Sequence, residues 1–251
     1  MASWAVSIAS ALDTNESITM DDLIRENDLV LEQNPGNETA LMYRALIYYN
    51  AEKYPLAIES ADKVLEISPE NSFAWHIIGS SWGNLGDFTK AADAFSRAAA
   101  LKPGEPEEYN LQGVALCRLG RYADAAEVLT KALEVDPSYA VAWNNLGVTY
   151  RYMNETDKAL DSLNRAVGED PSQAQYYANK GYVNLDRNDY SAAITCAVTA
   201  KKIEMTNVPQ WFVAGDAYYS QQDYQSAFYS YDGGFTTMEK ERLTESSPLG
   251  S

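Results

Sequence analysis

The sequence predicts an all-α protein built from repeated helix–turn–helix units, and three observations carry this prediction. Five prolines follow one another at intervals of 34 residues: Pro35, Pro69, Pro103, Pro137 and Pro171. Glycines keep the same interval at Gly79, Gly113, Gly147, Gly181 and Gly215. Within one interval the apolar residues recur at helical spacing. A fixed period of this length is typical of stacked repeats.

Each interval is expected to hold two helices. In residues 140–173 the positions i, i+3, i+4 and i+7 of one helix face are Trp143, Leu146, Gly147 and Tyr150. A second apolar stripe follows in Ala159, Leu163 and Ala166. Pro171 is expected to end the second helix, because the residue before a proline disfavours the helical conformation.

The residues between the two helices fit a tight turn. One turn position tolerates the left-handed conformation and is occupied by Gly86, Gly120, Asn154 and Asn188. The next position carries a carboxylate, which is favourable at the positive end of a helix dipole, in Asp87, Glu155, Asp189 and Asp223. Each interval is therefore predicted to be a helix–turn–helix.

This hairpin resembles the tetratricopeptide repeat (TPR). Residues 72–105 carry its pattern in Trp75, Ile78, Gly79, Trp82, Gly86, Phe88, Ala91, Phe95, Ala98 and Pro103. The resemblance implies an all-α fold, a right-handed α-solenoid of stacked hairpins. A single hairpin cannot bury its apolar face, so stability in such an array comes from stacking neighbours.

The repeat frame predicts the organisation of the chain. Residues 1–37 are a degenerate N-terminal repeat or cap, in which Trp4 and Leu12 belong to one helix and Thr19 caps the next. Five repeats follow at 38–71, 72–105, 106–139, 140–173 and 174–207. A sixth, divergent repeat fills 208–241, where Gly233 and Gly234 are expected to weaken the second helix. Residues 242–251 are expected to be a disordered tail or a remnant of cloning.

Composition argues against several classes of partner. The net charge of −17, from 36 acidic and 19 basic residues, opposes binding to nucleic acid and to anionic membranes. No apolar run reaches the ~18 residues of a membrane span. The two cysteines, Cys117 and Cys196, form no disulfide framework or metal motif and are expected to be small buried or half-buried residues. We expect a cytoplasmic protein.

Nothing in the sequence specifies catalysis. His76 is the single histidine, and no GxSxG, P-loop, HExxH or paired CxxC motif occurs. We therefore expect no enzyme activity, no cofactor and no metal site.

The resemblance implies that the first helices line a concave groove that receives partner peptides. At 100° per residue, the positions that face away from the buried stripe are mostly uncharged. The candidate groove residues are Tyr49, Phe73, His76, Asn110, Arg118, Asn144, Asn145, Arg151, Tyr152, Asn179, Tyr182, Phe212 and Tyr219. The same rule places Tyr43, Leu46 and Val148 there. Such a surface suits an apolar or amphipathic segment, although each aromatic residue can equally belong to packing between repeats.

Four asparagines of this set are spaced for a ladder along the groove. Asn110 and Asn144 are one period apart, as are Asn145 and Asn179. A side-chain amide offers both a donor and an acceptor, which is the combination that binds a peptide backbone. Solvated positions or local caps are the alternative role. Arg118 and Arg151, adjacent across two repeats, could pair one acidic group, although surface arginines are usually just solvated.

The sequence therefore predicts a non-catalytic scaffold or adaptor that binds a protein or peptide segment and remains monomeric. One alternative is a structural array that associates with itself through an exposed apolar end. Another is a regulatory module of a larger enzyme or complex.

Overall fold

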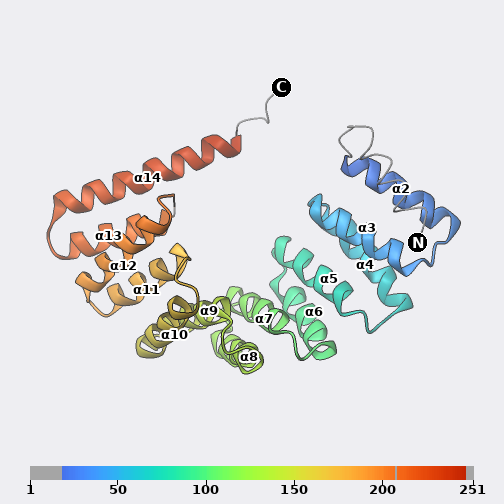
Figure 1. Ribbon diagram of the computed structural model, residues 1–251, viewed down its shortest axis with the longest axis horizontal. Helices are drawn as coiled ribbons and strands as arrows, with labels where there is room; N and C mark the ends of the chain where they lie inside the picture. The colour runs from blue at the N-terminus through green and yellow to red at the C-terminus, as the bar shows by residue number, and fades with distance from the viewer. Residues whose placement is uncertain (1–18, 207, 247–251) are drawn as a thin grey trace. The chain divides into compact units, whose positions relative to one another are not determined.

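The computed structural model describes residues 19–206 and 208–246, and its secondary structure in these ranges is helical throughout. The predicted helix that includes Trp4 and Leu12 lies outside them. The chain divides into two compact units, one ending at Pro103 and one beginning at Gly104. Helices of each unit pair as antiparallel hairpins along the chain (Figure 1). The all-α repeat architecture is therefore confirmed.

The first unit contains α2 (Met20–Gln33), α3 (Glu38–Asn50), α4 (Tyr54–Ile67), α5 (Ser72–Asn84) and α6 (Phe88–Leu101). The second unit contains α7 (Pro106–Arg118), α8 (Tyr122–Val135), α9 (Ala140–Tyr152), α10 (Thr156–Glu169), α11 (Ala174–Asp186), α12 (Tyr190–Ile203), α13 (Val208–Ser220) and α14 (Tyr224–Ser246). From α3 on, each hairpin joins a 13-residue first helix to a second helix, which has 14 residues in every hairpin but the last.

The turn inside each hairpin has a left-handed residue at the same repeat position. The expected residues adopt positive φ: Gly86 (82°), Gly120 (73°), Asn154 (60°) and Asn188 (58°). Glu52 (58°) and Gln222 (64°) occupy the equivalent positions in the hairpins α3–α4 and α13–α14. The turn geometry is thus common to all hairpins, even where the residue carries a Cβ that disfavours it.

Most of the predicted carboxylate caps are present at the second helices. The side chains of Asp87, Asp189 and Asp223 accept hydrogen bonds from backbone N–H groups three residues later at 3.1, 3.0 and 3.1 Å. Glu155 makes no such bond and instead forms an ion pair with Lys158 at 2.5 Å. Side-chain caps of this kind stabilise a helix by about 1 kcal/mol each.

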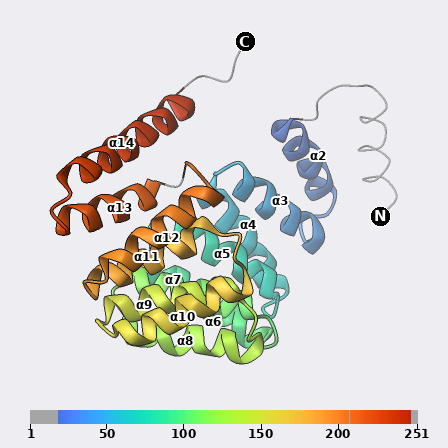
Figure 2. The same cartoon turned by 60° about the vertical axis from the view of Figure 1, so that its left-hand side comes forward.

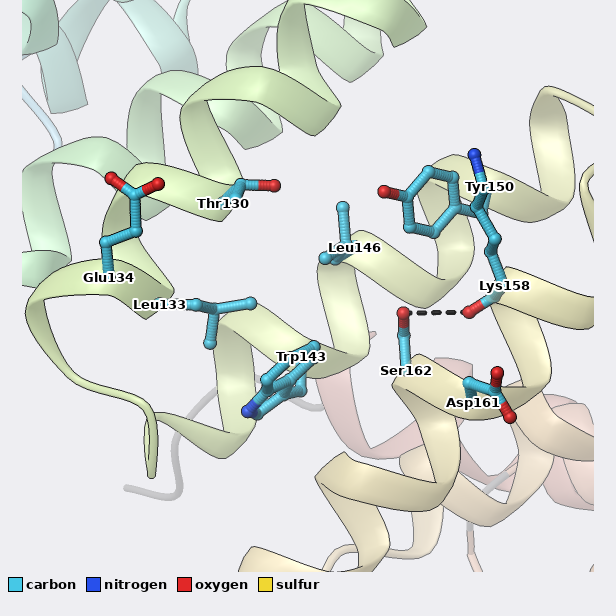
Figure 3. Close-up of a pocket in the computed structure, with 9 residues that line it drawn as sticks. All are labelled: Thr130, Leu133, Glu134, Trp143, Leu146, Tyr150, Lys158, Asp161 and Ser162. Carbon is cyan, nitrogen blue, oxygen red and sulfur yellow. Dashed lines mark hydrogen bonds between the residues drawn. The ribbon is translucent and has the colours of Figure 1, made fainter.

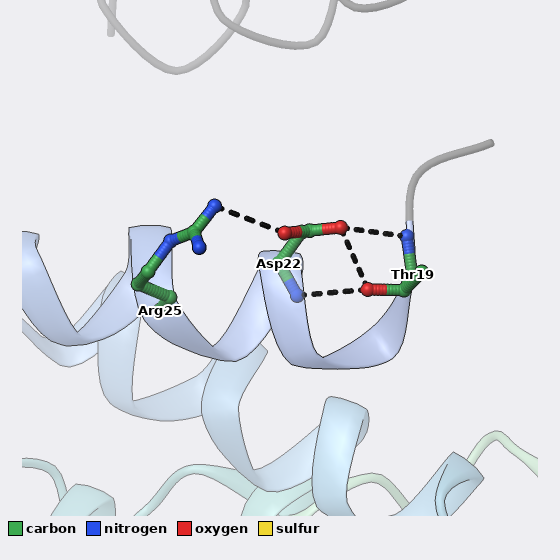
Figure 4. A network of polar contacts seen from close by, with 3 residues as sticks. All are labelled: Thr19, Asp22 and Arg25. Atoms are coloured by element: carbon green, nitrogen blue, oxygen red, sulfur yellow. Dashed lines mark hydrogen bonds and ion pairs between the residues drawn. The ribbon is translucent and has the colours of Figure 1, made fainter. Parts of the chain in front are cut away.

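The first described helix, α2, begins at the residue expected to cap it. Thr19 Oγ1 accepts from the Asp22 N–H at 3.2 Å, and the Asp22 carboxylate accepts from the Thr19 backbone N–H at 3.2 Å, which makes a capping box (Figure 4). Arg25 donates to the same carboxylate at 2.9 Å. The hydrogen bond from the Thr19 hydroxyl is the main influence that lowers the pKa of Asp22, so the carboxylate stays charged at the positive end of the helix.

Glycine in the first helices permits close contact with the second helix of the same hairpin. A Cβ added at Gly113 would lie 2.6 Å from Leu129 Cγ, and one at Gly147 would lie 2.6 Å from Leu163 Cγ. Leu129 and Leu163 are fully buried. The recurring glycine is therefore required by packing.

The tryptophans that recur every 68 residues form hydrogen bonds to the loop before their helix. The indole N–H donates to the backbone carbonyl six residues earlier, at 3.2 Å for Trp75, 2.8 Å for Trp143 and 3.4 Å for Trp211. That carbonyl belongs to a proline in the first two cases and to Met205 in the third. The same bond thus forms without the proline.

The expectation that Gly233 and Gly234 weaken the last helix is wrong. The helix α14 continues through both residues and runs to Ser246, beyond residue 241 where we expected the sixth repeat to end. A Cβ at Gly233 would lie 2.7 Å from the Trp211 ring, and one at Gly234 would lie 3.1 Å from Trp211 Cβ. The two glycines lie where α14 packs on this tryptophan and leaves no room for a Cβ, although each costs about 1 kcal/mol of helix propensity.

Candidate functional site

The first helices of the first unit form a pocket on the predicted groove face. It has a volume of about 350 Å³ and is lined by Glu38, Thr39, Met42, Tyr43, Leu46, Asn71 and Phe73. The Tyr43 and Phe73 side chains are 43% and 44% exposed. The pocket thus presents accessible apolar surface between α3 and α5, and its lining includes three residues that the angular rule assigned to the groove.

One end of this pocket carries a fixed carboxylate. Glu38 accepts hydrogen bonds from Ser68 Oγ at 2.8 Å and from Asn71 Nδ2 at 3.0 Å. These two bonds, that of Ser68 first, lower the pKa of Glu38, so the group stays negatively charged. The arrangement suits an apolar side chain that has a donor or a positive charge beside it. Glu38 is at the start of α3, and the helical periodicity that predicts the groove face gives no signal for a residue at a helix start.

The other two candidates in the first unit pack against aromatic neighbours. The His76 ring stacks on Phe73 at a centroid distance of 6.0 Å and meets Phe95 edge-on at 6.0 Å. Tyr49 contacts Tyr54 edge-on at 5.8 Å, near the turn of the hairpin. Phe73 is therefore the candidate of this unit that faces the pocket, with His76 behind it.

In the second unit the four candidate asparagines form a continuous hydrogen-bonded row across α7, α9 and α11. Asn179 Nδ2 donates to Asn144 Oδ1 at 2.8 Å, and Asn145 Nδ2 donates to Asn110 Oδ1 at 2.9 Å. Asn144 Nδ2 donates to Asn145 Oδ1 at 3.3 Å and links the two pairs. The predicted ladder therefore exists as a set of contacts.

The row is partly closed to a partner, contrary to the expectation that its amides face an open groove. Asn110 and Asn144 are buried, at 4% and 7% exposure, whereas Asn145 and Asn179 are half-buried. Gln175, one helical turn before Asn179, adds a bond from its Nε2 to Asn179 Oδ1 at 2.9 Å. Adjacent first helices are close enough for their amides to bond each other, and this contact takes up groups that we expected to be free.

Arg151 is also engaged inside the unit. Its Nε lies 2.5 Å from Asp186 Oδ2, and its guanidinium lies 5.0 Å from the centre of the Tyr182 ring. The expectation that Arg118 and Arg151 together pair one acidic group is therefore wrong for Arg151, because Asp186 on the next first helix is its partner. Arg118 is exposed at the end of α7.

The remaining aromatic candidates lie beside second helices. Tyr152 stacks on Tyr122 of α8 at 5.1 Å, and Tyr219 meets Tyr224 of α14 edge-on at 5.5 Å. Phe212 meets Phe235 of α14 edge-on at 5.5 Å. Tyr152 and Tyr219 nevertheless remain 55% and 60% exposed.

A second pocket lies between the second helices α8 and α10, over α9. Its volume is about 430 Å³, and its lining residues are Thr130, Leu133, Glu134, Trp143, Leu146, Tyr150, Lys158, Asp161 and Ser162 (Figure 3). Several of its polar groups already have partners. Lys158 pairs with Glu155 at 2.5 Å, and the Ser162 hydroxyl donates to the Lys158 carbonyl at 2.8 Å. The pocket is thus largely apolar, and polar groups at its rim are already paired with neighbouring residues of the chain.

The described ranges contain no group of three or more His, Cys, Asp or Glu side chains arranged to hold a metal ion. Both cysteines are free thiols; Cys196 is buried and Cys117 half-buried, as expected. Burial, the largest influence on each, raises the pKa of both thiols. Of the helices in the described ranges, none is both long and apolar enough to cross a membrane.

Several solved structures are similar in fold. YrrB, described as a TPR protein with an unusual peptide-binding site, has a TM-score of 0.60 and 18% identity over 73% of this chain and 95% of its own. PilW, a type IV pilus biogenesis factor, has a TM-score of 0.69 and 22% identity over 77% and 90%. MamA from Desulfovibrio magneticus RS-1 has a TM-score of 0.57 and 21% identity over 65% and 97%. No curated protein sequence matches the chain significantly.

Two family models match the sequence directly. Both describe the tetratricopeptide repeat, one over residues 108–168 and the other over residues 26–72 and 144–198. Together they cover more than half of the 251 residues. The matched ranges include hairpins of both units, and the structural similarities agree with them. The chain therefore belongs to the tetratricopeptide repeat family.

Proposed function

We propose that this chain is a non-catalytic protein–protein interaction module that binds an apolar or amphipathic partner segment on its first-helix face. The observation that carries the proposal is the open apolar pocket between α3 and α5, where Tyr43 and Phe73 are more than two-fifths exposed. Accessible aromatic side chains in a pocket are typical anchors for a partner, since they bury a large area on binding.

The charge at the pocket narrows the chemistry that we expect of the partner segment. Glu38 is held in its charged form at one end of the pocket. A segment with an apolar side chain for the pocket and a Lys, an Arg or a free N–H beside it would satisfy both features. This chemistry agrees with the overall charge of −17, which disfavours acidic partners.

In the second unit, Asn145 and Asn179 are the amides that we assign to the partner backbone. Each donates one hydrogen bond from its amide nitrogen and accepts one on its amide oxygen within the chain. An amide has two protons and two lone pairs, so each of these side chains retains one donor and one acceptor for a peptide. Both are half-buried rather than buried, unlike Asn110 and Asn144.

A displayed library of 12-residue peptides, selected on the purified full chain, tests the proposal. Affinities of the selected peptides are then measured for wild type, Phe73→Ala and Leu56→Ala. Leu56 is the matched control, because it is 41% exposed but lies on the second helix α4. Truncating an anchor costs about 1–2 kcal/mol, so we expect Phe73→Ala to weaken binding roughly 5- to 30-fold and Leu56→Ala to leave it unchanged.

The asparagines are tested in the same assay. Asn145→Ala with Asn179→Ala is compared with Asn164→Ala, an exposed asparagine on α10. A loss of affinity confined to the first pair, with unchanged circular dichroism, supports the proposal. Peptides that bind all the variants as tightly as wild type would refute the assignment of this face.

A further inference from the structure

The hydrogen bonds among the side-chain amides of the second unit all run in one direction. The row lies on the first helices α7, α9 and α11, which follow one another side by side (Figures 1 and 2). Its four bonds run from Gln175 to Asn179, from Asn179 to Asn144, from Asn144 to Asn145 and from Asn145 to Asn110, at 2.9, 2.8, 3.3 and 2.9 Å. In every bond the amide nitrogen of the first residue donates to the amide oxygen of the second. The row is therefore a one-way relay of donors.

The direction of the relay is a property of the row as a whole. A side-chain amide donates only from its nitrogen and accepts only on its oxygen. If one inner amide turned over alone, oxygen would face oxygen on one side and nitrogen would face nitrogen on the other. Asn110 and Asn144 are 4% and 7% exposed, so water has little access to replace a bond that is lost there. Each amide is therefore held in its orientation by its neighbours.

Asn144 is at the centre of the relay. Its Oδ1 accepts from Asn179 and its Nδ2 donates to Asn145, and these are the two half-buried amides that the proposed function assigns to the partner backbone. Asn144 itself is buried, so a partner has little access to it. One buried side chain thus contacts both of the amides that are open to a partner.

We propose that Asn144 is a positioning residue, which orients the amides of Asn145 and Asn179 for a partner backbone without binding the partner itself. Its donor keeps the oxygen of Asn145 directed toward it, and its acceptor does the same for the nitrogen of Asn179. The free donor and acceptor of these two amides then occupy fixed places. The inference rests on the proposed function, because it concerns the amides that bind the partner there.

The substitution Asn144→Asp separates the two contacts, because a carboxylate accepts hydrogen bonds but does not donate them. It retains the bond from Asn179, but it places a carboxylate oxygen against Asn145 Oδ1. We expect the Asn145 amide to turn over and to donate to this carboxylate. Asn110 is able to turn with it, since within the described residues the Asn110 side chain bonds only to Asn145. The free donor and acceptor of Asn145 then exchange places and no longer match the partner.

The matched control is Asn110→Asp, which makes the same change one repeat earlier. Asn110 contributes only its oxygen to the relay, and a carboxylate keeps that acceptor. The relay therefore keeps its direction in this variant, although both variants carry the same added charge at similarly buried positions. Circular dichroism and urea titration check that both remain folded.

The test uses a peptide selected on the full wild-type chain, with its affinity measured above neutral pH so that the added carboxylate is ionised. Asn145→Ala and Asn179→Ala are each introduced into the wild type, into Asn110→Asp and into Asn144→Asp. In the first two backgrounds we expect each alanine to weaken binding roughly three- to tenfold, the usual effect of a lost hydrogen bond. In Asn144→Asp we expect Asn179→Ala to keep this effect and Asn145→Ala to add none. A role of Asn144 in stability alone would not separate the two.

An effect of Asn145→Ala that is as large in Asn144→Asp as in Asn110→Asp would overturn this inference alone. If Asn144→Asp does not fold, Asn144→Leu replaces it, because leucine has a similar shape and no polar group. Both alanine effects should then largely disappear, and unchanged effects would overturn the inference. If neither alanine substitution weakens binding in the wild type, the assignment of these amides in the proposed function fails, and the inference fails with it.

Discussion

Replacing Gly147 by alanine tests whether the recurring glycine is set by packing. The added Cβ would lie 2.6 Å from Leu163 Cγ and 3.1 Å from the Ala159 carbonyl oxygen. Carbon atoms in contact prefer about 3.5–4.0 Å, so one of the groups has to move by roughly 1 Å. Leu163 is fully buried and the Ala159 oxygen is backbone, so neither yields easily.

The expected change in stability is the balance of two effects. Overpacking a core costs about 1–3 kcal/mol. Alanine recovers about 1 kcal/mol of helix propensity. We therefore expect Gly147→Ala to lower the free energy of unfolding by roughly 1 kcal/mol. Gly168→Ala is the matched control in the same hairpin, because no atom lies within 4 Å of its added Cβ. It should stabilise α10 by up to about 1 kcal/mol.

Urea titration followed by circular dichroism measures both variants. Repeat arrays need not unfold in two states, so the direction of the midpoint shift is the primary result. Opposite shifts for the two substitutions are expected. Adding Leu163→Ala to Gly147→Ala should cost less than Leu163→Ala alone, because the clash is removed. Gly147→Ala that stabilises the chain as much as Gly168→Ala would refute the packing argument.

Three further predictions concern single residues. Hydrogen bonds from Ser68 and from a neighbouring amide lower the pKa of Glu38, so the charged carboxylate stabilises the fold above the unfolded-state pKa of 4.5, and this stability is lost as the pH falls below that value. The difference in urea midpoint between wild type and Glu38→Gln should therefore shrink from pH 6 to pH 3. A constant difference would contradict this. Burial and the hydrogen bond to Asp216 raise the pKa of Tyr231 from 10.0 to about 12. The neutral phenol should therefore stabilise the fold fully below pH 10, and this stabilisation should be lost between pH 10 and 12. Spectrophotometric titration should show one late-ionising tyrosine in wild type that is absent from Tyr231→Phe. Glu52 has φ of 58°, so Glu52→Gly should raise the thermal midpoint by relieving about 1 kcal/mol of backbone strain, and a lower midpoint would show that the turn is unstrained.

The fold was predictable because its determinants are local and repeat. The prolines, the helix stripes and the turn residues each recur with one period, and every recurrence adds to the same signal. The prediction for Gly233 and Gly234 was wrong because the helix propensity of glycine is a local property, whereas the contact of this pair with Trp211 is tertiary. The left-handed Glu52 and Gln222 were missed for the converse reason, since neither residue favours the conformation that the repeat imposes.

The proximity of the candidate asparagines was predicted, but their bonding to one another was not. The angular rule placed Asn144, Asn145 and Asn179 on one face, and the structure brings them together. It could not tell that their amides bond each other, because that depends on the distance between neighbouring first helices. The pairing of Arg151 with Asp186 was missed similarly, although the two residues are 35 positions apart, one period plus one residue.

Site-specific photo-crosslinking tests the central claim most directly, that a partner segment lies on the first-helix face. A photoreactive phenylalanine is placed singly at Phe73 and Val148 on first helices and at Leu56 and Asp161 on second helices, and each protein is irradiated with a selected peptide. We predict crosslinked product at one or both of the first two positions and none at the last two. Crosslinking confined to positions 56 and 161 would contradict the account.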